Sequence, residues 1–161
     1  MKKLKPTYFF DHFSHIKAEW LKEKNIKTII SDLDSTLAPD GKDADESFQV
    51  WLTMLEEQHV ALIIVSNNHE KRVKTFLEKY QLVGYANCGK PSSKKIEKEL
   101  FQKGLEPNTT LFLGDQLFTD MWCGSNLGVQ TALVKPIPGH EPWTIRGKRM
   151  IEKMIMRNWT K

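Results

Sequence analysis

The chain has 161 residues, of which 40% are apolar and 27% are charged, and this balance is typical of a folded, soluble protein of one domain. Its apolar runs are far shorter than the roughly 20 residues of a membrane-spanning helix, and its basic start lacks the continuous apolar stretch of a secretory signal. Two cysteines are too few for a disulfide scaffold or a four-ligand zinc site. We therefore expect a cytoplasmic protein in which residues 1–161 form a single domain and Cys88 and Cys123 are reduced core residues.

The net charge of +4 is unevenly distributed along the chain. Residues 1–27 hold seven lysines against three acids, and residues 141–161 hold six basic residues against two acids, whereas the middle holds eleven bases and fifteen acids. An acidic centre favours cation binding, and basic ends favour an anionic partner such as a phospholipid surface or nucleic acid. On charge alone, a solvated surface without a partner is the simpler interpretation.

The first predicted element is a basic amphipathic helix within residues 1–26. Four apolar side chains at spacings of four, three and four residues indicate one face of this helix: Phe9, Phe13, Ile16 and Trp20. Such a stripe usually packs against a core, so we expect this extension to lie on or beside the rest of the domain.

Between the two ends, short apolar runs alternate with amphipathic stretches. The apolar runs predict five buried strands, at residues 28–30, 61–65, 84–88, 111–113 and 129–134. The amphipathic stretches predict helices at residues 46–59, 70–80, 92–103 and 120–127. This alternation with short connections predicts a three-layer, Rossmann-like α/β fold whose central, mostly parallel, five-stranded sheet is flanked by helices.

The last predicted element is a second basic amphipathic helix, within residues 141–161. Its apolar stripe consists of Ile151, Met154, Ile155 and Trp159. We expect this stripe to pack on the core as well. A basic amphipathic helix with tryptophan on its apolar side can alternatively lie at a membrane interface.

Polar residues follow each of the first four predicted strands. Because the carboxyl ends of parallel strands meet at one edge of the sheet, we expect these residues to converge there. The four sets are residues 31–36 (SDLDST), 66–68 (SNN), 89–91 (GKP) and 114–120 (GDQLFTD).

The converging side chains are suited to phosphoryl transfer. The carboxylates of Asp32 and Asp115 would repel each other unless a cation lay between them, and Mg²⁺ prefers such oxygen ligands. Ser66 offers a hydroxyl and Lys90 a compact positive charge to phosphate oxygens, and an aspartate can itself attack phosphorus. Each element alone is more simply a turn, a helix cap or a solvated charge. Their occurrence in order, each directly behind a predicted strand, favours the phosphoryl-transfer interpretation.

In these four segments the chain resembles the haloacid dehalogenase-like phosphohydrolases, over roughly residues 27–134. The resemblance implies that Asp32 is the nucleophile. It also implies that Asp34 is the general acid/base, which protonates the leaving oxygen and later activates a water molecule. Mg²⁺ would be held by the Asp32 carboxylate, the Asp34 backbone carbonyl and Asp115, with Asp120 as a further ligand or a residue behind the ligands.

The same resemblance implies which residues meet the substrate and how open the site is. Ser66, Asn67 and Lys90 would bind the phosphoryl group, and Thr36 would orient the first loop beside it. Only 29 residues separate Thr36 from Ser66, and 23 separate Ser66 from Lys90, so we expect no cap domain. An open site suits a large substrate better than a small metabolite that needs enclosure.

A finer resemblance is to the YqeG family of bacterial capless phosphatases, within subfamily IIIA. It rests on the residues around the first, second and fourth motifs, on the basic, aromatic opening segment and on Thr144-x-Arg146. That family is similar to the phosphatidylglycerophosphate phosphatases of mitochondria and plastids. The implied reaction converts phosphatidylglycerophosphate to phosphatidylglycerol, and the basic ends would contact the inner face of the membrane peripherally. Ser35 stands where the family commonly has asparagine, and we expect this difference to matter little because the side chain supports the loop.

Two alternatives stay open at this point. A phosphatase acting on a nucleic-acid phosphate end or a phosphoprotein would also suit basic ends, although no platform of aromatic residues for stacking lies beside the predicted site. A non-enzymatic, receiver-like phospho-switch needs its aspartate after the third strand, where this chain has Gly89 and Lys90. His140 and Arg146 are further candidates for substrate contact, with a plain surface position as the alternative for each.

Overall fold

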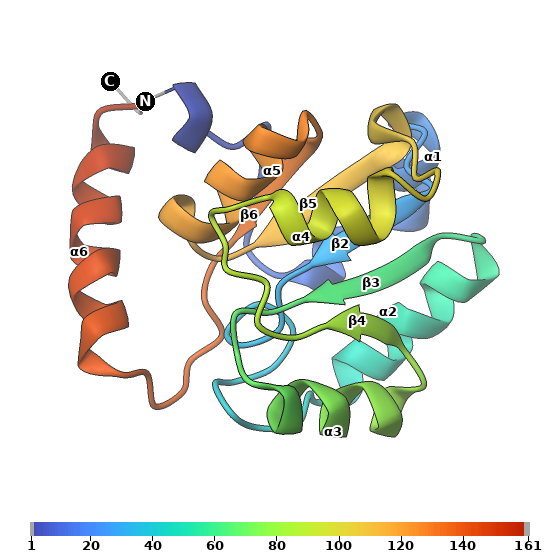
Figure 1. Ribbon diagram of the computed structural model, residues 1–161, viewed down its shortest axis with the longest axis horizontal. Helices are drawn as coiled ribbons and strands as arrows, with labels where there is room; N and C mark the ends of the chain where they lie inside the picture. The colour runs from blue at the N-terminus through green and yellow to red at the C-terminus, as the bar shows by residue number, and fades with distance from the viewer. Residues whose placement is uncertain (1, 160–161) are drawn as a thin grey trace.

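The centre of the computed structural model, which describes residues 2–159, is a parallel sheet of six strands (Figure 1). The order across the sheet is β1-β6-β5-β2-β3-β4, and every neighbouring pair is parallel. The strands are β1 (Tyr8–Phe10), β2 (Thr28–Ser31), β3 (Ala61–Val65), β4 (Val83–Tyr85), β5 (Thr110–Gly114) and β6 (Gln130–Val134). The predicted parallel α/β architecture is confirmed, with one strand more than predicted.

The helices lie close to their predicted positions, with differences at their ends. The α-helices are α1 (Ala18–Glu23), α2 (Glu46–Glu57), α3 (Glu70–Tyr80), α4 (Lys94–Ile96), α5 (Trp122–Leu127) and α6 (Trp143–Arg157). The 3-10 helices are η1 (Lys2–Leu4), η2 (Phe13–His15) and η4 (Pro107–Thr109), and π-helices are η3 (Glu97–Phe101) and η5 (Leu117–Met121). The helix predicted to begin at residue 120 therefore begins at Leu117, as η5.

Helices cover both faces of the sheet, because successive side chains of a strand point to opposite faces. Ile29 of β2 packs in the buried cluster that includes Phe48 of α2 and Phe76 of α3. Its neighbour Ile30 packs in a second cluster, which includes Ile96 of α4. The result is a three-layer arrangement, as the sequence predicted.

The N-terminal segment is not the helix that its apolar spacing predicts. Tyr8–Phe10 form β1, which pairs with β6 at one edge of the sheet. Phe13 and Ile16 are buried in the core, whereas Phe9 is 57% exposed. The helical prediction was wrong because four apolar residues at helical spacing can also be distributed over an edge strand, a 3-10 turn and a short helix.

The C-terminal helix α6 stands beside the body of the protein, on the side toward which the strands point (Figure 1). Ile155 and Trp159 pack against the small cluster around Met121, as predicted for the apolar stripe. Ile151 and Met154 do not, since they are exposed. The predicted stripe is therefore wrong for these two residues, because polar side chains of α6 occupy the face toward the body.

No cap domain is inserted between the motifs in the described part of the chain. The interval from Thr36 to Ser66 forms α2 and β3, and the interval from Ser66 to Lys90 forms α3 and β4. Within residues 2–159, each helix is too short or too polar to span a bilayer. Cys88 and Cys123 are free and buried.

Candidate active site

Three acidic residues meet at the carboxyl edge of the sheet. β2 and β5 are neighbours in the sheet, so Asp32 and Asp115, which directly follow them, emerge side by side. One carboxylate oxygen from each of Asp32, Asp115 and Asp120 lies within 4.8 Å of the others, and all three residues are buried. The fold thus brings together the carboxylates that the sequence placed at two separate strand ends.

The ammonium group of Lys90 joins two of these carboxylates. Its Nζ donates to Oδ1 of Asp32 at 2.9 Å and to Oδ1 of Asp120 at 2.7 Å, and the side chain is only 2% exposed. Burial lowers the pKa of Lys90, but the negative charges of Asp120 and Asp32 more than offset this effect and raise it. Lys90 therefore stays charged at neutral pH and faces the predicted nucleophile.

Asp120 turns back from η5 to hold both Lys90 and the loop after β5. Its Oδ2 accepts the backbone N–H groups of Asp115 at 3.2 Å and of Gln116 at 3.1 Å. This close approach needs glycine at position 114, because a Cβ on Gly114 would lie 2.3 Å from the Cβ of Asp120. Burial, reinforced by the charge of Asp32, raises the pKa of Asp120 to about 6, although Lys90 opposes the shift.

Thr36 bridges the two carboxylates that follow the central strands. Its Oγ1 donates to Oδ1 of Asp115 at 2.7 Å and lies 3.4 Å from Oδ2 of Asp32. Burial and the charges of Asp32 and Asp120 raise the pKa of Asp115 well above its ordinary range. Thr36 therefore contacts the acidic cluster from the first loop, and its role in orienting that loop stays a prediction.

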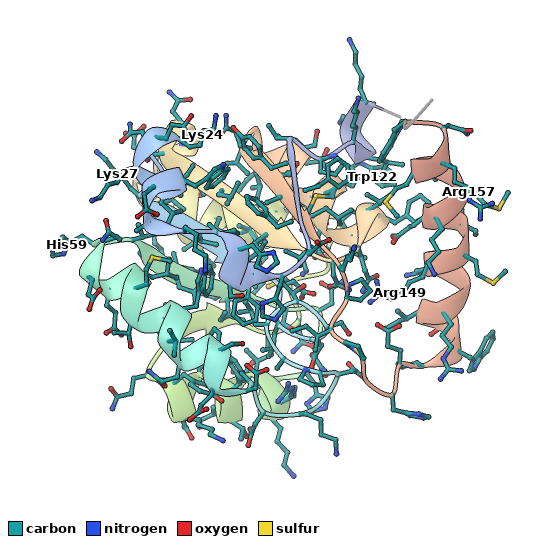
Figure 2. All side chains as sticks on the ribbon, turned by 180° about the vertical axis from the view of Figure 1, so that it is seen from behind. Lys24, Lys27, His59, Trp122, Arg149 and Arg157 are labelled. Atoms are coloured by element: carbon teal, nitrogen blue, oxygen red, sulfur yellow. The ribbon has the colours of Figure 1, made fainter. Side chains whose placement is uncertain are left out.

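Arg149 is a site residue that the sequence analysis missed. Figure 2 shows its side chain reaching from α6 toward the body of the protein, where it donates to Oδ2 of Asp115, and to the carbonyl oxygen of Asp115 at 3.3 Å. It also forms an ion pair with Glu141. Arg146 and His140, for which the sequence analysis left substrate contact or a surface position open, are both exposed. Helical spacing places residues on faces, but it does not tell which face meets the sheet.

Asp34 is held apart from the acidic cluster by its own set of partners. Its Oδ1 accepts Nε of Arg72 at 3.2 Å, Nη2 of Arg72 at 3.0 Å and the N–H of Gly41 at 2.9 Å. Its Oδ2 accepts Nδ2 of Asn68 at 2.9 Å, and 15% of the side chain is exposed. Arg72 was missed because no local pattern connects the first turn of α3 with the loop after β2. The carboxylate is thus fixed in orientation while part of it stays accessible.

Ser66 and Asn67 shape the loop after β3. Oγ of the buried Ser66 accepts the backbone N–H of Asn68 at 3.0 Å. The amide of Asn67 pairs with the backbone of Lys90, since its Nδ2 donates to the carbonyl at 2.9 Å and its Oδ1 accepts the N–H at 2.8 Å. Asn67 therefore positions Lys90, and its contact with a substrate stays a prediction.

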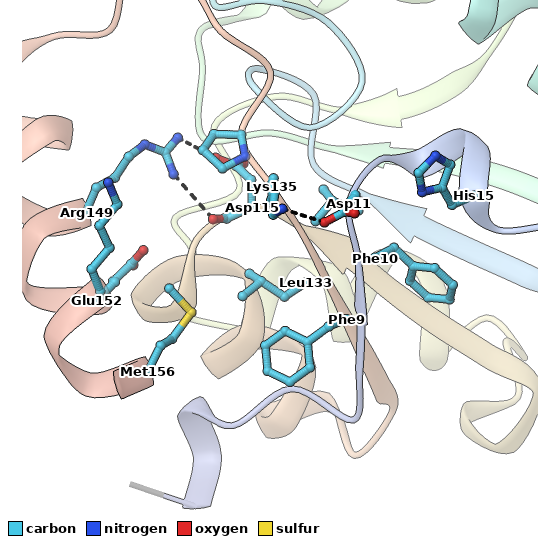
Figure 3. A pocket seen from close by; sticks show the side chains of 13 residues that line it. Phe9, Phe10, Asp11, His15, Asp115, Leu133, Lys135, Arg149, Glu152 and Met156 are labelled. Carbon is cyan, nitrogen blue, oxygen red and sulfur yellow. Dashed lines mark hydrogen bonds and ion pairs between the residues drawn. The ribbon is translucent and has the colours of Figure 1, made fainter. Parts of the chain in front are cut away.

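A cavity of about 700 Å³ adjoins the site between α6 and the strands β1 and β6 (Figure 3). Asp115 and Arg149 form part of its wall, and apolar side chains such as Phe9, Leu133 and Met156 form another part. The space beside the acidic cluster thus combines a charged end with an apolar lining.

The acidic cluster has the chemistry of a divalent cation site. Its donors are carboxylate oxygens only, which Mg²⁺ prefers. The three carboxylates face one another in a buried position. Lys90 is shared by Asp32 and Asp120, while Arg149 is divided between Asp115 and Glu141. A cation held by Asp32 and Asp115 would offset their mutual repulsion, so these residues fit the ion.

Comparison with known proteins shows which family the chain resembles. The family model described as haloacid dehalogenase-like hydrolase matches residues 9–134. The chain is 34% identical over 152 residues to the protein of Bacillus subtilis (strain 168) named "Probable phosphatase YqeG", and the match covers 94% of this chain and 88% of that one.

Solved structures share the fold at low sequence identity. The cobalt-bound deoxy-D-mannose-octulosonate 8-phosphate phosphatase (YrbI) of Haemophilus influenzae matches with a TM-score of 0.51 and 16% identity, over 70% of each chain. The 3-deoxy-D-manno-octulosonate 8-phosphate phosphatase of Moraxella catarrhalis, solved with magnesium, phosphate and its sugar, matches with a TM-score of 0.50 and 17% identity, over 66% of this chain and 65% of that one.

Proposed function

Because the chain belongs to the haloacid dehalogenase-like hydrolases and is a phosphatase of that family, we propose that it is a Mg²⁺-dependent phosphomonoesterase that forms an aspartyl-phosphate on Asp32. The observation that carries this proposal is the buried contact between Asp32 and Lys90 beside two further carboxylates. A carboxylate that is to attack phosphorus needs positive charge beside it, because the transferred group is itself negative.

The proposed reaction has two steps. In the first, an oxygen of Asp32 forms a bond to phosphorus while the bond from phosphorus to the ester oxygen breaks, and Asp34 gives that oxygen a proton. In the second, Asp34 takes a proton from water as the water oxygen attacks phosphorus, and inorganic phosphate leaves Asp32. Lys90, 2.9 Å from Asp32, offsets the charge on the transferred group. The hydrogen bonds from Arg72 and Asn68 support this role of Asp34, because they fix its direction.

Further residues of the site support the same reaction. Asp32, Asp115 and the backbone carbonyl of Asp34 would hold Mg²⁺, which supplies positive charge beside the phosphoryl oxygens. Ser66 would donate its hydroxyl proton to a phosphoryl oxygen, since its oxygen acts as the acceptor in its hydrogen bond with the N–H of Asn68. Asp120 would keep Lys90 in place.

We propose a lipid head group as the substrate, with phosphatidylglycerophosphate converted to phosphatidylglycerol. Three observations support this choice: the intervals between the motifs hold no cap domain, the cavity beside Asp115 has an apolar lining, and the chain has basic end segments. An open site admits a head group that stays in the plane of a bilayer. The proposed location is the inner face of the membrane, in peripheral contact.

Phosphate release from a soluble generic ester with Mg²⁺ tests the reaction. We expect Asp32→Asn to abolish hydrolysis and Asp34→Asn to lower it by about a hundredfold or more, with folding retained. The matched control is Asp43→Asn, because Asp43 is a surface aspartate paired with Lys79 outside the site. Full activity of either site variant would refute the proposed roles.

The substrate requires a separate panel. Phosphatidylglycerophosphate in vesicles is compared with a sugar phosphate, a 3′-phosphorylated oligonucleotide and a phosphopeptide at equal phosphate concentration. We expect the highest kcat/KM for the lipid. A higher value for any of the soluble substrates would exclude the lipid assignment and leave the phosphatase chemistry intact.

A further inference from the structure

The outer face of α6 is apolar and uncovered in the described structure. Trp143 is 82% exposed, Met150 70%, Ile151 53% and Met154 66%. At about 100° per residue, these four side chains fall within an arc of about 100° on one side of the helix. We call them the α6 outer face. Such an arc on a helix that already contacts its own protein through another side needs a partner to cover it.

The opposite side of α6 is the one that holds the helix to the protein. Arg149 contacts Asp115, Glu152 accepts the backbone N–H of Phe118 at 3.1 Å, and Met156 lines the cavity. The outer face is therefore not a core surface that has failed to pack, because α6 has a separate inward side with its own contacts.

The charges beside the outer face indicate what kind of partner covers it. Arg146, Lys148 and Lys153 are exposed, and the one acidic residue of α6, Glu152, is buried against the body. The solvent side of α6 is thus apolar and cationic. This combination fits an anionic phospholipid surface, in which apolar side chains enter the boundary of the acyl chains and cations meet the head groups. A second copy of the chain would bring the cations of two helices together, which is unfavourable.

We propose that the α6 outer face binds anionic phospholipid bilayers and seats the protein on them. The inference rests on the proposed function, because membrane binding serves an enzyme whose substrate is a lipid. Lys153 lines the same cavity as Asp115 and lies between the outer face and Arg149 around the helix. Binding through the outer face would hold the protein at the bilayer, where a lipid substrate lies, with the cavity on the other side of α6.

Sedimentation of the full chain with vesicles tests the inference. We expect binding to vesicles that contain phosphatidylglycerol and weak binding to vesicles of phosphatidylcholine alone. Changing Met150→Glu and Met154→Glu together should lower the affinity by about tenfold or more, because charges replace apolar groups at the interface. The matched control is Val50→Glu with Val83→Glu, since these exposed residues, at 70% and 62%, lie on α2 and β4. This control should bind as the unchanged protein does.

A second measurement does not depend on glutamate substitutions. Brominated phosphatidylglycerol should quench the fluorescence of the unchanged protein, and Trp143→Phe should remove most of that quenching while vesicle binding persists. Circular dichroism checks that each variant is folded. Equal vesicle binding by the double methionine variant and the unchanged protein would overturn the inference, as would an unchanged quenching by Trp143→Phe.

The outcomes also separate this inference from the proposed function. If the unchanged protein hydrolyses a soluble ester but binds no vesicles, the membrane role of α6 is wrong and the phosphatase proposal stands. If it binds vesicles through α6 but releases no phosphate from any ester, the proposed function is wrong. A dimer that the double methionine variant dissociates, together with no vesicle binding, would assign the outer face to a second copy and refute the inference.

Discussion

Replacing Lys90 with methionine tests the electrostatic design of the site most directly. The substitution keeps much of the side-chain volume but removes the cation that faces Asp32 and Asp120 in a buried position. Breaking a buried ion pair by removing one partner costs about 3–5 kcal/mol. The cost has a ceiling, because each stranded carboxylate can take up a proton instead. Above an ordinary aspartate pKa of about 3.9, each pH unit adds about 1.4 kcal/mol, so that this ceiling is about 4 kcal/mol at pH 7 for each carboxylate.

We therefore expect Lys90→Met to lower the free energy of unfolding by about 3–4 kcal/mol at pH 7 in metal-free buffer, measured by urea denaturation. At about pH 5.5 the ceiling is about 2 kcal/mol for each carboxylate, so the loss should be smaller there. The control is Lys74→Met, which removes an exposed pair with Glu78 and should cost less than about 1 kcal/mol. A loss below about 1 kcal/mol for Lys90→Met, or an equal loss at both pH values, would refute this reasoning.

Three further predictions concern the neighbouring residues. Gly114→Ala should lower hydrolysis of a soluble ester by about tenfold or more, because the new Cβ would lie 2.3 Å from the Cβ of Asp120 and displace that side chain. An unchanged kcat would contradict this. In the metal-free protein the pKa of Asp120 is raised to about 6, above its unfolded value, so its contribution to stability is present at low pH and is lost as the pH rises through about 6. Mg²⁺ should therefore raise the melting temperature more at about pH 7.5 than at about pH 5.5, and an equal rise at both would count against the site. Arg72→Gln removes two hydrogen bonds to Asp34 and should lower kcat more than it changes KM. A change in KM alone would exclude a role of Arg72 in orienting Asp34.

Local pattern was sufficient for the strands β2 to β6 and for the position of the acidic cluster. Buried strands such as β2 and β5 are short apolar runs with turn residues behind them, and such runs are visible in the sequence. Once the strands are taken as parallel, their carboxyl ends share an edge, so Asp32 and Asp115 had to meet. The motif residues were found because they follow strands: Asp32, Ser66 and Asp115 follow directly, and Lys90 follows β4 after a short loop.

The contacts that the tertiary structure decided join elements with no local relation. Arg72 reaches Asp34 across 38 positions, and Arg149 reaches Asp115 across 34. The periodicity of α6 showed an amphipathic helix, but which of its sides meets the protein depends on where β1 and β6 leave room for it. β1 itself was predicted as helix, because an edge strand of three residues is stabilised by pairing with β6 rather than by its own sequence. The sequence alone thus determined the order of β2 to β6 along the chain and which polar residues follow them. The folded structure decided which distant side chains hold the site and which side of α6 faces solvent, because those choices depend on packing between elements.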